Sequence, residues 1–116
     1  RLYRKLCPLC KKPAEIDPDV LSANQIAPAF FEGATLFEAG GCPKCNNIGF
    51  KGRGAFMEVL QVSEAIRGAT VKGSPADVIR SIAIQEGMAT LKDVGLMKVR
   101  DGVTSLRAAL EVTGSE

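Results

Sequence analysis

Two copies of a Cys-Pro-x-Cys unit, separated by 31 residues, constrain the possible fold of this chain more than any other feature. They contain all four cysteines of the 116 residues, Cys7, Cys10, Cys42 and Cys45, and the chain has no histidine. Each unit can fold as a tight turn that aims two sulfurs at one point, so two units present four ligands in a tetrahedron with no open position. An all-sulfur set favours zinc or an iron–sulfur cluster over harder ions. We therefore interpret the four cysteines as ligands of a structural zinc ion, with the iron–sulfur cluster as an alternative.

Two further chemistries compete for the same cysteines. Two disulfides would suit a small secreted chain, but nothing else in the sequence indicates secretion, and the apolar content does not require such crosslinks. Thioredoxin-like redox chemistry would use one Cys-x-x-Cys at a helix N-terminus, whereas here two similar units lie among turn-forming residues. Without histidine, the chain lacks the Ser-His-Asp and Cys-His constellations. We expect no catalytic residue and no residues that bind an organic cofactor.

The composition is that of a globular protein, with 46% hydrophobic and 24% charged residues. The formal net charge of +2 is too small to indicate a nucleic-acid or membrane partner. No apolar run approaches the roughly 20 residues that a membrane-spanning helix needs, and no secretory signal opens the sequence. The first residue is Arg1 rather than Met, so we expect a piece of a longer protein.

The sequence predicts a small α+β fold in which a tetracysteine zinc-binding lobe, with short strands and a short helix, precedes a small helical subdomain. The expected parts are residues 1–54 for the zinc lobe, 55–62 for a connecting strand and 63–116 for the helical subdomain. Asp17 followed by Pro18 indicates the capped start of the short helix. Residues 34–39 indicate a short strand closed by two glycines. The run 55–62 is apolar apart from Glu58 and Gln61, and its Phe and Val content favours a strand.

Helix start signals divide the second lobe into four helices. The expected N-cap residues are Ser63, Ser74, Thr90 and Thr104. Thr90 forms a capping box with Asp93, and Met97 is expected to face inward as core filler. Each cap contributes about 1 kcal/mol, so together they favour a small helical bundle.

Four phrases of the sequence, spread over its length, are specific enough to identify a family. They are the paired Cys-Pro-x-Cys units, Gly49-Phe50-Lys51-Gly52-Arg53, Gly87-Met88 with Thr90-Leu91, and Gly102-Val103-Thr104-Ser105-Leu106. In these phrases and their order, essentially the whole chain resembles the C-terminal third of the type II secretion and type IV pilus assembly ATPases. The resemblance implies a hexameric motor at the cytoplasmic face of the bacterial inner membrane, which hydrolyses ATP to drive pilus or pseudopilus assembly.

The resemblance also implies roles for the parts of this chain. In relatives the cysteines that match Cys7, Cys10, Cys42 and Cys45 bind zinc in a small metal-binding subdomain, and the helices after it pack on a RecA-like core. The implied partners are the rest of the motor, neighbouring subunits and inner-membrane platform proteins, with no nucleic acid and no direct membrane span. The chain contains neither the phosphate loop G-x-x-x-x-G-K-[ST] nor an acidic Walker B strand, so ATP and Mg²⁺ are expected only in a missing upstream domain. The intact protein is implied to be an ATPase, and we expect this chain to be inactive alone.

The expected function is a non-catalytic, zinc-stabilised module of a secretion or pilus-assembly motor, which contributes to subunit packing and to contact with platform proteins. The alternative is a zinc ribbon that binds nucleic acid, because five basic residues lie near the cysteines: Lys11, Lys12, Lys44, Lys51 and Arg53. The one Tyr and five Phe count against this alternative, since the Phe lie in apolar runs rather than among basic residues as stacking platforms. A chaperone-like zinc module would need more cysteine repeats than the two pairs present.

Overall fold

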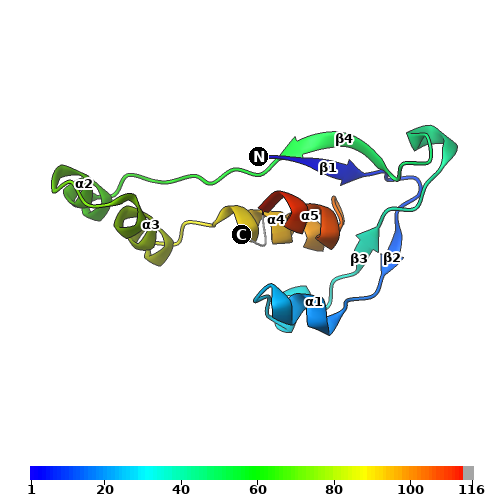
Figure 1. The fold of residues 1–116 in the computed structure, drawn as a ribbon, viewed down its shortest axis with the longest axis horizontal. Helices are drawn as coiled ribbons and strands as arrows, with labels where there is room; N and C mark the ends of the chain where they lie inside the picture. The colour runs from blue at the N-terminus through cyan, green and yellow to red at the C-terminus, as the bar shows by residue number, and fades with distance from the viewer. Residues whose placement is uncertain (114–116) are drawn as a thin grey trace.

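The computed structural model describes residues 1–113, which form four short strands, five α-helices and two 3-10 helices (Figure 1). In chain order the elements are β1 (Leu2–Leu6), β2 (Lys12–Ala14), α1 (Pro18–Ala23), η1 (Pro28–Phe31), β3 (Leu36–Glu38), η2 (Pro43–Cys45), β4 (Phe50–Ala55), α2 (Glu64–Val71), α3 (Ala76–Gln85), α4 (Leu91–Arg100) and α5 (Leu106–Thr113). This confirms the small α+β fold that the sequence predicts. The last residues of the predicted helical subdomain, 114–116, lie outside the described residues.

The strands form two antiparallel pairs that position both cysteine units. β1 pairs with β4, with Leu2 opposite Ala55 and Leu6 opposite Phe50. The register shifts between Arg4 and Leu6. β2 pairs with β3, and Lys12 lies opposite Glu38. The first cysteine unit connects β1 to β2 and the second connects β3 to β4, so the two ladders carry both units to one end of the molecule (Figure 1).

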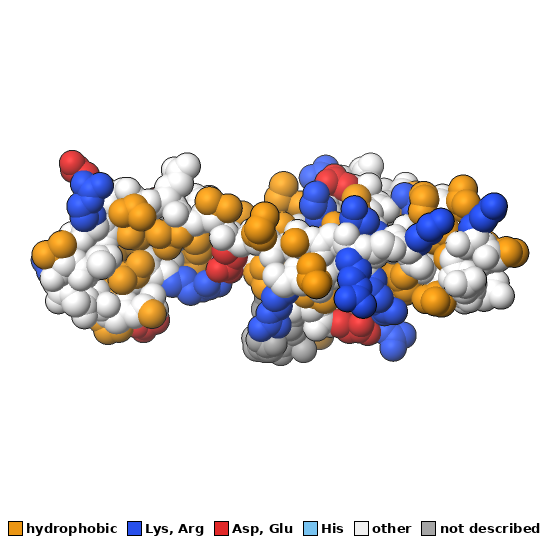
Figure 2. All heavy atoms as spheres, turned by 90° about the horizontal axis from the view of Figure 1, so that it is seen from above, with side chains coloured by type: hydrophobic (Ala, Val, Ile, Leu, Met, Phe, Trp, Pro, Cys, Tyr) orange, Lys and Arg blue, Asp and Glu red, His pale blue; other side chains and the backbone are white. Residues whose placement is uncertain are grey.

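The helices α2 and α3 pack against each other at the opposite end and form what we call the α2–α3 arm (residues 64–85). The neck (residues 56–62) leads into the arm as an extended chain. The described residues span 56 × 28 × 23 Å, with a Cα radius of gyration of 17.0 Å against about 13 Å for a compact domain of this length. Figure 2 shows the narrow waist between the arm and the rest of the molecule. Among residues 1–113, no helix has the length and apolar content to cross a membrane.

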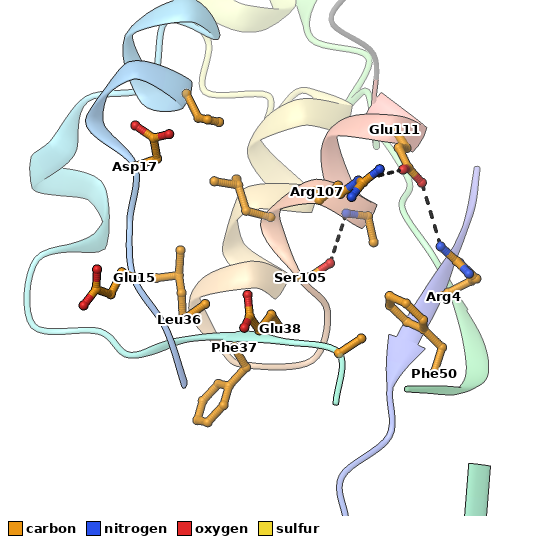
Figure 3. Close-up of a pocket in the computed structure, with 15 residues that line it drawn as sticks. Arg4, Glu15, Asp17, Leu36, Phe37, Glu38, Phe50, Ser105, Arg107 and Glu111 are labelled. Carbon is orange, nitrogen blue, oxygen red and sulfur yellow. Dashed lines mark hydrogen bonds and ion pairs between the residues drawn. The ribbon is translucent and has the colours of Figure 1, made fainter. Parts of the chain in front are cut away.

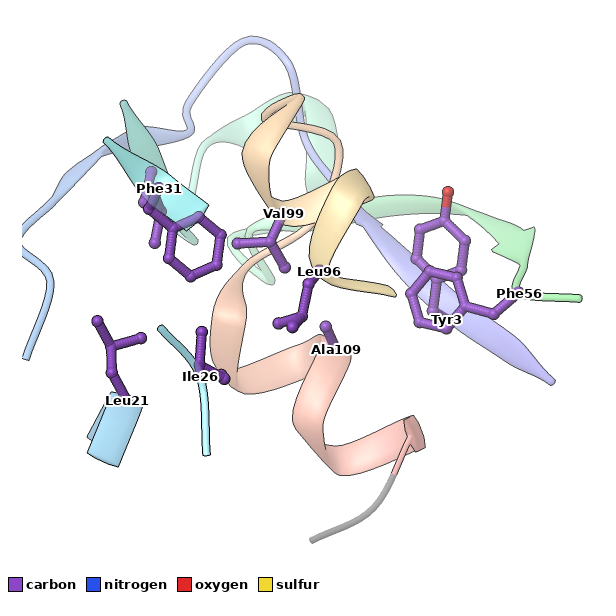
Figure 4. Close-up of a cluster of buried hydrophobic side chains, with 9 residues drawn as sticks. Tyr3, Leu21, Ile26, Phe31, Phe56, Leu96, Val99 and Ala109 are labelled. Carbon is purple, nitrogen blue, oxygen red and sulfur yellow. The ribbon is translucent and has the colours of Figure 1, made fainter. Parts of the chain in front are cut away.

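One hydrophobic core joins the cysteine half of the chain to the last two helices. Its buried side chains are Tyr3, Leu21, Ile26, Phe31, Leu36, Phe56, Leu96, Val99 and Ala109 (Figure 4). The rings of Tyr3 and Phe56 stack with their centroids 4.1 Å apart. α4 and α5 contribute Leu96, Val99 and Ala109, and they contact β1 and β3. This core therefore lies across the boundaries predicted around residues 55–62, and the subdomain division itself stays a prediction.

Three expectations about the second half of the chain are wrong. Residues 56–62 belong to no strand, and only Ala55 of the predicted strand lies in β4, because the β1–β4 ladder ends there and the described residues offer no further partner. The helices do not form one bundle, since α2 packs on α3 whereas α4 packs on α5 and on the strands. Met97 is 53% exposed rather than part of the core.

The predicted helix caps are partly confirmed. In three of them a side-chain oxygen accepts a backbone N–H from the first turn: Asp17, Ser63 and Thr90. Ser74 is not a cap, because Pro75 is the N-cap of α3. The N–H of Ser74 instead donates to the carbonyl of Ala69 at the end of α2. Ser105 rather than Thr104 caps α5, and the buried Thr104 hydroxyl donates to the carbonyl of Arg4 at 2.8 Å.

Candidate metal centre

The four cysteine sulfurs converge at the end of the molecule where the two ladders meet. All of them lie within 4.8 Å of one another. Three sulfur–sulfur distances are 3.8 Å for Cys7–Cys42, 3.7 Å for Cys10–Cys45 and 3.7 Å for Cys42–Cys45. Four sulfurs at about 2.3 Å from a central ion would form a tetrahedron with edges of about 3.8 Å. The spacing therefore fits one tetrahedral four-sulfur site, and it is far longer than the roughly 2.05 Å of a disulfide bond.

Each cysteine unit is a tight turn, as the sequence predicts. The N–H of Cys10 donates to the carbonyl of Cys7 at 3.4 Å, and the N–H of Cys45 donates to the carbonyl of Cys42 at 3.2 Å. These bonds fold each unit back on itself, so that both sulfurs of a pair face the same point. The chain leaves the second turn through Asn46, whose φ of 57° is a left-handed conformation that asparagine tolerates better than most residues.

Backbone N–H groups point at two of the sulfurs and stabilise negative charge on them. They are Gly41, which donates to Cys10 Sγ at 3.2 Å, and Cys42 and Gly49, which donate to Cys45 Sγ at 3.4 and 3.2 Å. Gly49 can hold this position only as glycine. Its φ is +86°, and an added Cβ would lie 2.5 Å from the Cβ of Ala39. Its carbonyl also accepts the N–H of Cys7 at 2.9 Å, so one residue links both cysteine units.

The surroundings move the pKa values of two thiols in opposite directions. Burial, followed by hydrogen bonds with the neighbouring thiols, raises the pKa of Cys10 to about 12 against the lowering effect of the Gly41 N–H. Burial also acts to raise the pKa of Cys45, but the N–H groups of Cys42 and Gly49 and the adjacent thiols lower it to about 6. The N–H groups therefore favour the negatively charged form of the Cys45 sulfur, which is the form in which a cysteine binds a metal ion.

The sulfur cluster can hold a soft metal ion with every coordination position filled by protein. Cys7 and Cys45 are buried, and the other two cysteines are partly buried. With no open position for water or substrate, such a site builds structure and supplies no Lewis-acid chemistry of its own.

Three contacts that sequence reasoning missed connect the region of the first cysteine unit to the turn between α4 and α5. The N–H of Leu6 donates to the carbonyl of Val103 at 2.9 Å, the ammonium of Lys11 donates to the carbonyl of Gly102 at 2.9 Å, and Thr104 donates to β1 as described above. In the sequence, residues 102–106 mark this turn, but Thr104 is interpreted there as a helix cap. The structure shows that Thr104 is instead fully buried.

A separate cavity of about 580 Å³ lies between β1, β3 and α5 (Figure 3). Three of its charged groups pair with one another: Arg4 and Arg107 both pair with Glu111, at 3.9 and 3.6 Å, and Arg4 also lies 4.1 Å from the ring of Phe50. Asp17 on the opposite wall caps α1. The cavity is separate from the sulfur cluster, since none of the four cysteines lines it.

Comparison with known proteins places the chain in a family. The family described as Type II/IV secretion system protein matches residues 1–111. The type IV pilus assembly ATPase PilB of Thermus thermophilus is 40% identical over 113 residues, which cover 97% of this chain and 13% of that protein. PilB of Myxococcus xanthus is 38% identical, covering 99% of this chain and 20% of that protein, and the type II secretion system ATPase E of Vibrio cholerae is 34% identical, covering 97% and 22%. The chain spans only 13–22% of the length of these relatives. It belongs to the family of type II/IV secretion system proteins.

Proposed function

We propose that this chain is a non-catalytic, zinc-stabilised module of a secretion or pilus-assembly motor ATPase, with a role in subunit packing and in contact with platform proteins. The family membership over residues 1–111 supports the assignment to a motor, because the relatives carry the names of pilus assembly and secretion ATPases. The convergence of the four sulfurs supports the structural metal and is the observation that carries the proposal.

A single zinc ion fits the site better than an iron–sulfur cluster. The sulfur spacing is that of a mononuclear tetrahedron, whereas an iron–sulfur cluster places several irons between its cysteine ligands and needs more room. Cys7, Cys10, Cys42 and Cys45 would be its four ligands. Because structural zinc contributes about 10–16 kcal/mol of apparent binding free energy in small modules, it would dominate the folding of the lobe around it.

Metal analysis combined with thiol titration of the native chain tests the zinc site. We expect one equivalent of zinc, no visible absorption, and four thiols that become reactive only after denaturation. Two equivalents of disulfide, or visible absorption with bound iron, would refute the zinc assignment and leave the family assignment intact.

The motor activity belongs to the longer protein in this proposal. The chain carries no phosphate loop, so ATP and Mg²⁺ would bind in the part of the protein outside these residues, and the metal module would stabilise and pack. The 116-residue chain should show no ATP turnover above a blank, whereas the longer protein that contains it should hydrolyse ATP. Turnover by the chain alone would refute the non-catalytic role.

The proposed place of action is the cytoplasmic face of the bacterial inner membrane, in a hexamer that contacts platform proteins. The names of the relatives as pilus assembly and secretion ATPases support this location. Copurification of the longer protein with membranes that contain the platform proteins, compared with membranes that lack them, tests the contact. Equal recovery from both membranes would contradict it.

The aromatic side chains argue against the nucleic-acid alternative. Base stacking needs exposed aromatic faces, but Phe31 and Phe56 are buried in the core. Phe50 and Phe37 carry Arg4 and Lys11 over their rings, at 4.1 and 4.5 Å. The motor assignment therefore agrees better with the side-chain arrangement.

A further inference from the structure

The backbone of the neck is extended and unpaired. The β1–β4 ladder ends where the N–H of Phe56 donates to the carbonyl of Arg1 at 2.8 Å. Beyond it, among residues 57–62 the backbone makes one hydrogen bond to the described chain, in which the carbonyl of Gln61 accepts the N–H of Ser63 at 3.1 Å. A row of free N–H and C=O groups on an extended chain is the edge that another strand can pair with.

Four apolar side chains of the neck are exposed, two on each of its faces, beside the polar Glu58 and Gln61. Met57 is 67%, Val59 70%, Leu60 41% and Val62 62% exposed, and successive residues of an extended chain point to opposite sides. Figure 2 shows hydrophobic side chains gathered over the narrow waist. A contiguous exposed apolar patch of this kind marks an interaction surface.

One face of the neck lines a groove of about 570 Å³. Met57 and Val59 line it together with Ala83, near the end of α3, and Met88, in the segment between α3 and α4. The neck is also held in place, because the carboxylate of Glu58 accepts two hydrogen bonds from Arg80, at 3.0 and 3.1 Å. A segment fixed in its extended form loses little conformational freedom on pairing, so this segment is preorganised for a partner.

A strand that is apolar on both faces belongs in a sheet that is covered on both sides. In an antiparallel sheet with one solvent-exposed face, polar and apolar residues alternate along each strand. In a sheet covered by helices on both faces, the strands are nearly continuous apolar runs. An ATPase of the phosphate-loop type is built on such a sheet, in which a strand leads through the loop into a covering helix. The relatives are ATPases, and this chain covers no more than 22% of the length of those compared, which leaves room for that domain.

We propose that residues 57–62 form an added strand of the β-sheet of the ATPase domain in the longer protein, outside these 116 residues. The inference rests on the proposed function. Main-chain hydrogen bonds would supply the attachment, and the side chains of Met57, Val59, Leu60 and Val62 would be buried beneath the covering helices. The neck would thus anchor the cysteine module and the arm to the motor domain.

Hydrogen exchange in the 116-residue chain and in the longer protein tests the added strand. We expect the amides of residues 57–62 to exchange rapidly in the chain alone and at least about tenfold more slowly in the longer protein. Exchange at equal rates in both would overturn the inference. Protection that arises in the chain alone and grows with its concentration would also overturn it, because the partner would then be a second copy.

Matched substitutions separate docking from folding. Val59→Asp should leave the melting temperature of the 116-residue chain unchanged and lower that of the longer protein, because an unpaired charge would then be buried in the sheet. Val71→Asp, at an 82% exposed position in the arm, should change neither. Equal effects of the two variants on the melting temperature of the longer protein would overturn the inference.

Failure of the inference can be told apart from failure of the proposed function. If the longer protein hydrolyses ATP and binds zinc while the amides of the neck stay unprotected, only the inference is wrong. If the longer protein neither hydrolyses ATP nor binds zinc, the proposed function is wrong.

Discussion

Gly54 is a residue where a single methyl group should disturb the core. It lies opposite Tyr3 in the β1–β4 ladder, and an added Cβ would come within 2.5 Å of atoms of the Tyr3 ring. That ring is 4% exposed and stacks on Phe56, so it cannot move aside without disturbing the core. We expect Gly54→Ala to lower the free energy of unfolding by about 1–3 kcal/mol, measured by urea denaturation.

Gly68→Ala is the matched control for this prediction. Gly68 lies inside α2, and nothing stands within 4 Å of its added Cβ. Alanine there should raise the free energy of unfolding by about 0.5–1 kcal/mol, because glycine has the higher conformational freedom in the unfolded chain. If both variants changed stability in the same direction, the close packing of Tyr3 against Gly54 would be refuted.

At the scale of residues, the sequence predicts the sulfurs of the site but not the backbone around them. Each Cys-Pro-x-Cys unit is a local turn that aims its two sulfurs at one point, and the pairing of β1 with β4 and of β2 with β3 brings the two units together. Gly41 and Gly49 act through their N–H groups, which every residue except proline has. No side-chain chemistry marks them, so their role is visible only in the structure.

At the scale of elements, the Thr90 capping box is a testable source of stability. The Thr90 hydroxyl accepts the N–H of Asp93 at 3.1 Å, and the Asp93 carboxylate accepts the N–H of Thr90 at 3.0 Å. Thr90→Ala should lower the free energy of unfolding by about 1 kcal/mol, measured by thermal and urea denaturation. Ser74→Ala should change it by less than about 0.5 kcal/mol, because the Ser74 hydroxyl makes no hydrogen bond to residues 1–113. A larger loss at Ser74 would show that the sequence-based cap is right and the observed helix start is wrong.

The elements that sequence reasoning misplaced have physical reasons. Ser74 and Thr104 are both good capping residues, yet each stands one residue before the observed N-cap, because local chemistry cannot choose between adjacent starts. The strand predicted over residues 55–62 has the right composition, but a strand also needs a partner, and pairing is a property of tertiary structure. Without a pairing partner among the described residues, this segment stays an extended chain with exposed apolar side chains.

At the scale of the whole molecule, Glu58 holds the arm to the body. Its carboxylate accepts hydrogen bonds from Arg80 of α3 and, at 2.7 Å, from the N–H of Leu91 at the start of α4. Glu58→Gln should speed amide exchange of Leu91 about two- to fivefold, as expected for loss of a solvent-exposed ion pair. Glu32→Gln, which removes a charge from an exposed loop, is the control and should leave that exchange unchanged.

The effect of Glu58 should depend on pH in a defined direction. The hydrogen bonds from Arg80 and then from Leu91 lower the pKa of Glu58 below its ordinary value. A depressed carboxyl pKa stabilises the folded state above the ordinary pKa of about 4.3, and this contribution is lost as pH falls through the folded-state value. The difference in the free energy of unfolding between wild type and Glu58→Gln should therefore be full at pH 7 and decrease as the pH falls below about 4.3. A constant difference across this range would exclude the ionised carboxylate as its cause.

The arrangement of the two halves is the part of the fold that the sequence does not reveal. Capping and amphipathic patterns predict helices one at a time, whereas the choice of α4 and α5 to pack on β1 and β3 depends on contacts between residues nearly 100 positions apart. The bonds from Leu6, Lys11 and Thr104 join the first cysteine unit and β1 to the turn between α4 and α5. These bonds therefore connect the region of the cysteine cluster to α4 and α5, whereas no such hydrogen bond among the described residues runs from the cysteine units to the arm.

Removal of the metal should consequently destabilise the pair α4 and α5 and leave the pair α2 and α3 unchanged. With zinc bound, we expect slow amide exchange in α4 and α5. A strong chelator, or Cys42→Ser, should raise exchange in β1, β4, α4 and α5, because the core that contains Tyr3, Leu96 and Val99 loses the lobe that supports it. Exchange in α2 and α3 should stay the same, since these helices pack on each other and contribute no side chain to that core. If chelation left α4 and α5 as protected as before, the metal centre would organise only its own turns, and the coupling through the turn at residues 102–105 would be wrong.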